Sequence, residues 1–253
     1  SYTVSGACAS AAHAIGQGVA LIRSGKQDVV FAGGAEEAAW TSAVMFDAMG
    51  VLSTRYNDVP ERASRPYDAA RDGFVIAGGA GMLVLEALEH ARARRARCHA
   101  EVCGYGASSG GDMVSLSPAA AAWAMRDALA DAGVASVDYV NTHAIGSEAG
   151  DVAELEALRE VFADAVPAMS STKGLGGHSL AAAGAQQAIH SLLMMAEGFV
   201  AGCANLERPD AAAAGLPLAA AAFERRLDRV MSNSFGFGGT NASLVFGRLP
   251  DAA

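Results

Sequence analysis

Residues 166–197 read VPAMSSTKGLGGHSLAAAGAQQAIHSLLMMAE, and this stretch decides the fold. Residues 166–171 predict a short buried strand, and residues 179–197 predict a helix that ends at Gly198. A glycine-rich loop joins these two elements. A strand, a loop and a helix in that order are typical of an α/β sheet whose strands are covered on both faces.

The same alternation of strands and helices begins at residue 117. Ser117 and Pro118 predict the start of a helix, because serine caps helices well and proline fits the first helical position. Asp151 is expected to cap a further helix, which carries its apolar residues on one stripe. Three more buried strands are predicted, at residues 137–141, 229–233 and 242–247.

The N-terminal part of the chain predicts a second set of elements. Residues 5–24 predict a helix, and residues 28–33 predict a short buried strand. Residues 74–88 and 101–106 also have the character of strands. The polar segment 52–73 is too long for an ordinary connection, which favours a functional loop.

Composition excludes several classes of function for this chain of 253 residues. Its net charge of −9 argues against nucleic acid as a partner, because a phosphate backbone binds to a basic face. No apolar run reaches the ~20 residues that a membrane span needs. The four cysteines include no C-x-x-C pair, so we expect no metal site and a reduced, cytoplasmic protein.

Reactive side chains follow several of the predicted strands or open a predicted helix. Cys8 lies in the first turn of the helix at 5–24, where the helix dipole is expected to lower the thiol pKa. His143 follows the strand at 137–141, while Lys173 and His178 lie on the loop after residue 171. Each residue taken alone has a plain structural reading, as an inert buried cysteine or a structural histidine.

Together these stretches resemble the β-ketoacyl-[acyl carrier protein] synthases of the thiolase superfamily, most closely the type I condensing enzymes. Four stretches carry the resemblance: SGACASAAHAIG (5–16), LSTRYNDVPERASRPYDAARDGFVIAGG (52–79), TKGLGGHSLAAAGAQ (172–186) and MSNSFGFGGTNASLVF (231–246). The resemblance implies two similar halves in a five-layer αβαβα sandwich. Residues 1–98 would be the end of the first half, without the segment that precedes the nucleophile in full-length members, and residues 99–253 the complete second half.

The resemblance also implies decarboxylative Claisen condensation and a role for each matching residue. Cys8 would be the acylated nucleophile, and His143 and His178 would promote decarboxylation of a malonyl thioester. Backbone N–H groups of Cys8 and Phe237 would form the oxyanion hole. Lys173 would set the electrostatics around the histidines, and Glu154 would support the site, although a solvated helix carboxylate is the plain alternative for Glu154. The residues implied to bind pantetheine or acyl chain are Ile145, Ser147, Phe235, Gly236 and Gly238.

The implied partners follow from the same resemblance. The substrates would be carried on the phosphopantetheine of an acyl carrier protein, with no other cofactor, in fatty acid or related polyketide synthesis. The full-length enzyme would be a homodimer without nucleic acid or membrane partners. Arg55, Arg62 and Arg65 are candidates for a basic patch that faces an acidic carrier protein.

Three residues depart from the family pattern, and they keep a second reading open. Ala144 and Ile145 stand where the family has glycine and threonine, and Gly176 replaces a threonine before His178. Loss of the threonine hydroxyl at 145 predicts weaker binding of the pantetheine arm. The alternative is a catalytically silent truncated or partner subunit that only binds acyl carrier protein or a synthase chain.

Overall fold

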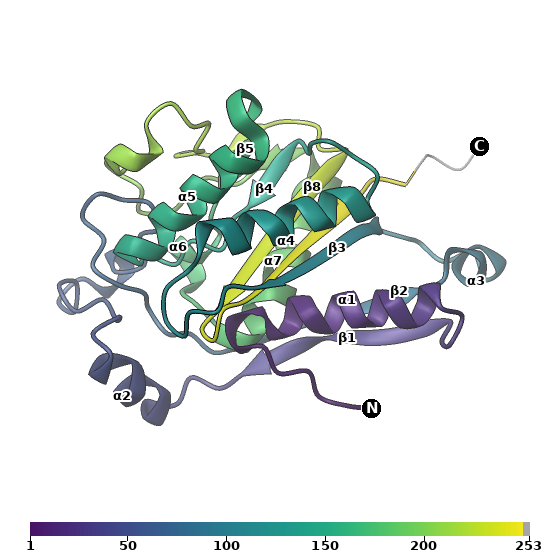
Figure 1. The fold of residues 1–253 in the computed structure, drawn as a ribbon, viewed down its shortest axis with the longest axis horizontal. Coiled ribbons are helices and arrows are strands. Elements are labelled where there is room, and N and C mark those ends of the chain that lie inside the picture. The colour runs from purple at the N-terminus through teal and green to yellow at the C-terminus, as the bar shows by residue number, and fades with distance from the viewer. Residues whose placement is uncertain (250–253) are drawn as a thin grey trace.

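The computed structural model describes residues 1–249, which build an α/β fold around a five-stranded sheet (Figure 1). The strand order is β3-β9-β8-β4-β5. Strands β4, β5 and β8 run parallel to one another, and β9 lies antiparallel between β3 and β8. The bounds are β3 Glu101–Ser109, β4 Tyr139–Asn141, β5 Ala168–Ser170, β8 Arg229–Gly236 and β9 Thr240–Gly247.

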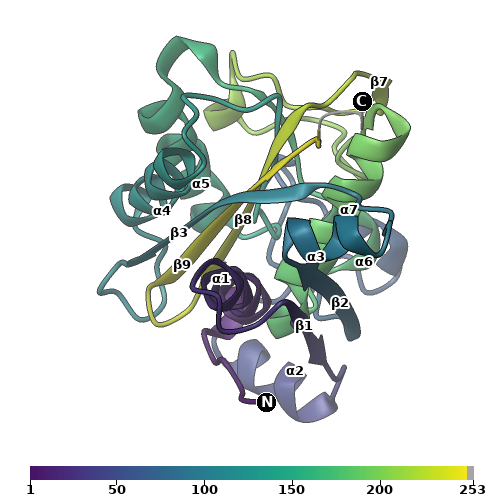
Figure 2. The ribbon, with the colours of Figure 1, turned by 90° about the vertical axis from the view of Figure 1, so that its right-hand side faces the viewer.

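Helices cover both faces of this sheet, and a second small sheet adds a further layer (Figure 2). Helices α4 (Pro118–Asp131) and α5 (Glu148–Phe162) cover one face, and α1 (Ser10–Arg23) and α7 (Ala183–Glu197) cover the other. Strands β1 (Val29–Glu36) and β2 (Gly79–Glu86) form an antiparallel pair on the far side of α1 and α7. The described residues therefore supply four layers of the predicted five.

The outer face of the β1–β2 pair carries exposed apolar side chains. Phe31 is 71% exposed and Met82 is 59% exposed. Residues 28–33 were expected to form a buried strand, and this prediction is wrong because β1 pairs only with β2 and is covered on one face alone.

Small residues allow the layers to approach closely. A Cβ atom added to Gly106 of β3 would lie 2.1 Å from the carbonyl oxygen of Ala124, so only glycine lets α4 lie directly on that strand. One core fills the space between the sheet and α1 and α7, and a second fills the space between the sheet and α4 and α5. Neighbouring residues of β8 serve different cores, with Val230 in the first and Met231 in the second.

The predicted helix ends are largely confirmed. Ser117 caps α4 by accepting a hydrogen bond from the N–H of Ala120, and Gly198 ends α7 in the left-handed conformation. The cap of α5 is Ser147, so the prediction that Asp151 caps this helix is wrong.

Several segments differ from the sequence prediction in extent. The strand expected over 74–88 is confined to β2, and residues before it make isolated bridges to Leu52 and His178. Residues 250–253 of the predicted second half lie outside the described residues. The remaining α-helices and strands are α2 Trp40–Ala48, α3 Leu88–Ala93, α6 Lys173–Gly176, β6 Phe199–Val200 and β7 Phe223–Glu224, and the sequence predicted none of these five.

The parallel strands β4, β5 and β8 end at the same edge of the sheet. They end at Asn141, Ser170 and Gly236 respectively. In α/β sheets, ligands bind outside the carboxyl ends of such strands. None of the helices within residues 1–249 is long and apolar enough to cross a bilayer.

Candidate active site

The sheet edge brings together most of the reactive residues that the sequence singles out. His143 lies two residues after β4, Lys173 lies three residues after β5, and Phe237 directly follows β8. His178 lies just beyond α6, and its backbone N–H donates to the carbonyl of Val75 at 2.8 Å. The alignment of three parallel strands therefore places His143, Lys173 and Phe237 at one edge.

Cys8 lies in a short 3₁₀ turn, Ala7–Ala9, directly before α1. Ala7 has a φ of +46°, a left-handed conformation that residues with a Cβ rarely adopt. The end of β8 approaches this turn closely, since a Cβ on Gly236 would lie 2.8 Å from the carbonyl oxygen of Gly6. Glycine at 236 is therefore what allows the Phe237 loop to reach the cysteine.

Burial favours the protonated form of the Cys8 thiol. Burial raises its pKa to about 11, although the charge of Lys173 and hydrogen bonds from two backbone N–H groups act in the opposite direction. The predicted lowering of this pKa by the helix dipole is wrong, because burial outweighs the favourable groups. The two N–H donors belong to Cys8 and Phe237, the same pair that the family resemblance assigns to the oxyanion hole.

His143 and His178 form a buried, uncharged pair. Their ring centroids lie 5.3 Å apart, and the rings are nearly perpendicular at 86°. Burial, followed by the positive charge of Lys173, holds both pKa values well below the ordinary value of 6.5. Nδ1 of His143 and both ring nitrogens of His178 have no hydrogen-bond partner among the described residues. The pair therefore has free capacity to bind a ligand oxygen.

Lys173 is buried beside the histidines and has two neutral partners. Its Nζ donates to the carbonyl of His143 at 2.9 Å and to Oε1 of Gln187 at 2.8 Å. Burial lowers its pKa to about 8, although Glu154 favours the charged form. Lys173 thus holds a positive charge close to the histidines at neutral pH.

Two buried carboxylates from α5 fix the loop that carries His143. Glu154 accepts the N–H groups of His143 and Ala144 at 2.9 and 2.8 Å. Asp151 accepts the N–H groups of Ile145 and Gly146 at 3.0 and 3.2 Å. The two acids are three residues apart on one helix face, so together they bind four consecutive amides.

Glu154 is therefore not the solvated helix carboxylate of the plain alternative. It is 1% exposed and also accepts hydrogen bonds from Tyr67 and Asn233. Burial raises the pKa of this carboxyl, but four donors that require an acceptor favour its charged form. Asp151 was missed as a site residue, although its spacing from Glu154 gave a signal.

Gln187 of α7 is a second residue that sequence reasoning missed. Its Oε1 accepts from Lys173, and its Nε2 donates to the carbonyls of Thr142 and Asn233 at 3.0 Å. It thereby joins Lys173 to Thr142, which directly follows β4, and to Asn233 within β8. The available signal was weak, because Gln187 stands among small residues of a helix that carries other polar side chains.

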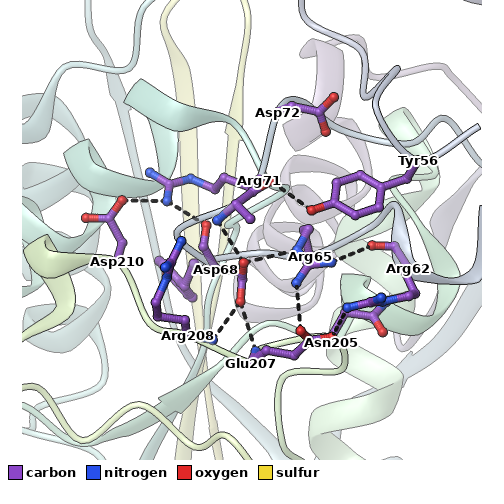
Figure 3. A network of polar contacts seen from close by, with 12 residues as sticks. Tyr56, Arg62, Arg65, Asp68, Arg71, Asp72, Asn205, Glu207, Arg208 and Asp210 are labelled. Carbon is purple, nitrogen blue, oxygen red and sulfur yellow. Dashed lines mark hydrogen bonds and ion pairs between the residues drawn. The ribbon is translucent and has the colours of Figure 1, made fainter.

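Two buried arginines of the loop 52–73, Arg65 and Arg71, make ion pairs (Figure 3). Arg65 pairs with Asp68 at 3.1 Å, and Arg71 lies 3.5 Å from Asp151 and 2.6 Å from Asp210. Arg71 therefore links this loop to the carboxylate that holds residues 145 and 146.

The ion pairs bear on the basic patch that was predicted from Arg55, Arg62 and Arg65. Arg65 is 2% exposed, so the expectation that it faces a carrier protein is wrong. Arg55 and Arg62 are exposed, but each is paired with acidic residues of the same chain.

A cavity of about 260 Å³ opens at this edge. Its wall includes His143 together with Ile145, Ser147, Phe235, Gly236 and Phe237. Gly238 does not line it, and its N–H instead donates to the carbonyl of Met113 at 2.8 Å. Phe74 also lines the cavity, and its ring centroid lies 5.6 Å from that of His178.

The substitutions at 144 and 176 fit the structure without strain. Ala144 donates to Glu154, and its carbonyl accepts from Ser171 at 2.6 Å, so the loop is held despite the extra methyl group. A Cβ on Gly176 would meet nothing within 4 Å. Within residues 1–249, no group of three His, Cys, Asp or Glu side chains could hold a metal ion.

Comparison with known proteins gives the same assignment. Residues 1–91 match the family model "Beta-ketoacyl synthase, N-terminal domain", and residues 99–207 match "Beta-ketoacyl synthase, C-terminal domain". The chain belongs to the β-ketoacyl synthase family. It is 56% identical over 251 residues to 3-oxoacyl-[acyl-carrier-protein] synthase 1 of Escherichia coli K12, covering 99% of this chain and 62% of that protein.

Other relatives agree with this assignment. The synthase 1 of Haemophilus influenzae is 55% identical, with 98% of this chain and 61% of that protein covered. The crystal structure of a β-ketoacyl synthase from Burkholderia phymatum has a TM-score of 0.94 at 42% identity, with 98% of this chain and 61% of that chain covered. The thiolase-like α/β fold is thus confirmed. The chain spans about three fifths of the length of the curated relatives that it matches.

Proposed function

We propose that this chain carries the active site of a 3-oxoacyl-[acyl-carrier-protein] synthase. One observation carries the proposal: a cysteine flanked by two N–H donors lies at the same sheet edge as a pair of neutral histidines whose ring nitrogens lack partners. The names of the relatives support the same reaction class. The product would be a chain longer by two carbons, in fatty acid or related polyketide synthesis.

In the first step, the sulfur of Cys8 attacks the carbonyl carbon of an acyl thioester on carrier-protein pantetheine. The carbonyl oxygen becomes negative and accepts hydrogen bonds from the N–H groups of Cys8 and Phe237, which are fixed before the reaction. The C–S bond to pantetheine then breaks. The proton of the Cys8 thiol passes to the leaving pantetheine sulfur, because the resting thiol is neutral.

In the second step, a malonyl thioester binds against His143 and His178. Their N–H groups donate to the thioester oxygen while the C–C bond to the carboxylate breaks and carbon dioxide leaves. The resulting enolate carbon attacks the acyl carbonyl on Cys8, and the C–S bond to Cys8 breaks. Cys8 leaves as a thiolate and regains a proton from solvent. Neutral histidines suit this step because each can donate a hydrogen bond without losing a proton.

The roles of the other site residues, and the partners, rest on the family resemblance. We propose Lys173 and Glu154 as groups that tune and hold the histidines, and Ile145, Ser147, Phe235 and Gly236 as walls of the pantetheine and acyl site. The proposed partner is an acyl carrier protein; one solved relative of 30% identity is a ketosynthase in complex with its acyl carrier protein. A homodimer, a cytoplasmic location and a boundary near residue 98 between two halves complete the proposal.

A second candidate is a silent subunit that binds the carrier protein without chemistry. Ile145 favours it, because an isoleucine offers the pantetheine arm no hydrogen bond where the family has a threonine. The intact Cys8, His143 and His178 favour the enzyme.

A condensation assay separates the two candidates. The chain is incubated with an acyl carrier protein loaded with an acyl group and with malonyl carrier protein, and the 3-oxoacyl product is measured by mass spectrometry. Product that depends on Cys8, and that disappears in Cys8→Ala, supports the enzyme. Carrier binding without product from a folded chain supports the silent subunit.

A further inference from the structure

The two donors of the proposed oxyanion hole lie on separate segments of the chain. The N–H of Cys8 belongs to the turn before α1, and the N–H of Phe237 belongs to the turn between β8 and β9. Their spacing is not fixed by sheet pairing, because residues 7–9 belong to no strand. Another contact therefore has to fix the position of one turn relative to the other.

The side chain of His13 makes that contact. Its Nε2 lies 2.7 Å from Oγ1 of Thr240, the first residue of β9 and three residues from Phe237. His13 itself lies on α1, one helical turn beyond Cys8. Within residues 1–249, the contact between His13 and Thr240 is the one side-chain hydrogen bond that joins α1 to the segment 237–240.

The imidazole of His13 is itself held in place. Its Nδ1 lies 2.7 Å from the hydroxyl of Tyr105 on β3, and the two rings meet edge to face at 88°. A Cβ on Gly6 would lie 2.7 Å from Cδ2 of His13, so the ring also covers the turn that carries Cys8. With both ring nitrogens engaged, the ring has a single orientation.

We propose that His13 is a positioning residue that sets the spacing of the two oxyanion donors by joining α1 to the β8–β9 turn. The inference rests on the proposed function, since the donors matter only if an oxyanion forms at Cys8. His13 does not touch the reacting atoms. It acts through Thr240, whose Oγ1 also lies 3.4 Å from the Cβ position of Gly6.

Thr240→Val tests this role with little change in shape, because only the hydroxyl is replaced by a methyl group. His13→Asn is the second variant, and Thr41→Val on the exposed face of α2 is the matched control. The first readout is the rate of Cys8 alkylation by iodoacetamide at pH 8, followed by mass spectrometry of the Cys8 peptide. A displaced Phe237 N–H disfavours the thiolate, so we expect a rate about 3-fold to 10-fold lower in Thr240→Val. Thr41→Val is expected to match the wild type.

The second readout separates positioning from loss of structure. Acylation of Cys8 by acyl carrier protein is expected to fall about 10-fold or more in Thr240→Val, because misplaced donors stabilise the oxyanion poorly. Decarboxylation of malonyl carrier protein is expected to remain, since it uses His143 and His178. Equal losses of both partial reactions, with a lower melting temperature, would overturn the proposal. So would alkylation and acylation rates within 2-fold of the wild type. If the wild type itself is not acylated, the proposed function fails, and the alkylation rate alone decides the role of His13.

Discussion

The carboxylates of α5 and the two histidines are all buried, but their hydrogen bonding differs. Glu154 accepts four hydrogen bonds, from His143, Ala144, Tyr67 and Asn233. His178, which is 1% exposed, has no partner at either ring nitrogen among the described residues. Buried polar groups are normally paired, so an unpaired one requires an explanation. The difference separates groups that hold the site from groups that await a ligand.

The strongest test of the holding role is Glu154→Leu. The substitution leaves two backbone amides and two side chains without their acceptor and removes the counter-charge of Lys173. We expect the free energy of unfolding to fall by about 3–5 kcal/mol in urea denaturation. Glu156→Leu, an exposed position on the same helix, is the control and is expected to change little. If the free energy of unfolding falls by less than about 1 kcal/mol in Glu154→Leu, this carboxylate does not hold the fold together.

His178→Leu tests the opposite expectation for the unpaired group. Replacing an unpaired buried imidazole by an apolar side chain removes a desolvation cost, so the free energy of unfolding should stay unchanged or rise. Decarboxylation of malonyl carrier protein should fall about 100-fold to 1000-fold, because one donor to the enolate oxygen is lost. His99→Leu, at an exposed histidine, serves as the control. A His178→Leu protein that is strongly destabilised but still active would show that His178 stabilises the fold and does not serve the reaction.

Lys173 interacts with both the carboxylates and the histidines, and its lowered pKa predicts how stability depends on pH. Its pKa is about 8 in the folded protein and near 10.5 in an ordinary lysine, so the unfolded chain binds more protons between these values. Stability should therefore rise with pH across that window, by at most about 1.4 kcal/mol per pH unit relative to Lys173→Met. Lys26→Met, at the exposed lysine, should keep the wild-type pH dependence. Parallel curves for the wild type and Lys173→Met would show that burial does not shift this pKa.

Ile145→Thr is expected to have the smallest effect. It restores a hydroxyl at the cavity wall, where one added hydrogen bond is worth roughly 0.5–1.5 kcal/mol. We predict that kcat/KM for malonyl carrier protein rises about 2-fold to 10-fold in steady-state kinetics. Ile145→Val keeps a β-branched apolar side chain and should give no gain. An unchanged or lower kcat/KM in Ile145→Thr would contradict the prediction.

Local sequence signals predicted the C-terminal half of the fold well. Ser117, Pro118 and Gly198 mark helix ends through backbone chemistry that depends on near neighbours alone, and the structure confirms them. The error at α5 arose because Ser147 and Asp151 are both good caps, and only the structure shows that Asp151 turns back to residues 145 and 146.

Features that depend on distant partners escaped prediction. The pKa of Cys8 is raised by burial, and the turn at residues 7–9 packs against α7, β8 and β9, which lie more than 100 residues away in the sequence. A helix-dipole argument from residues 5–24 does not contain these contacts. Arg65 appeared to be a surface cation, but Asp68 and the segment around Glu207 bury it. Gln187 gave little signal, since its partners lie within β8 and on the segments that follow β4 and β5.

Covalent acylation of Cys8 tests the central claim most directly. The chain is mixed with an acyl carrier protein loaded with a defined acyl group, and the Cys8 peptide is then analysed by mass spectrometry. We expect an adduct of the acyl mass on Cys8 and no adduct in Cys8→Ala. A folded chain that binds the carrier protein but leaves Cys8 unmodified would contradict the assignment of Cys8 as the acylated nucleophile.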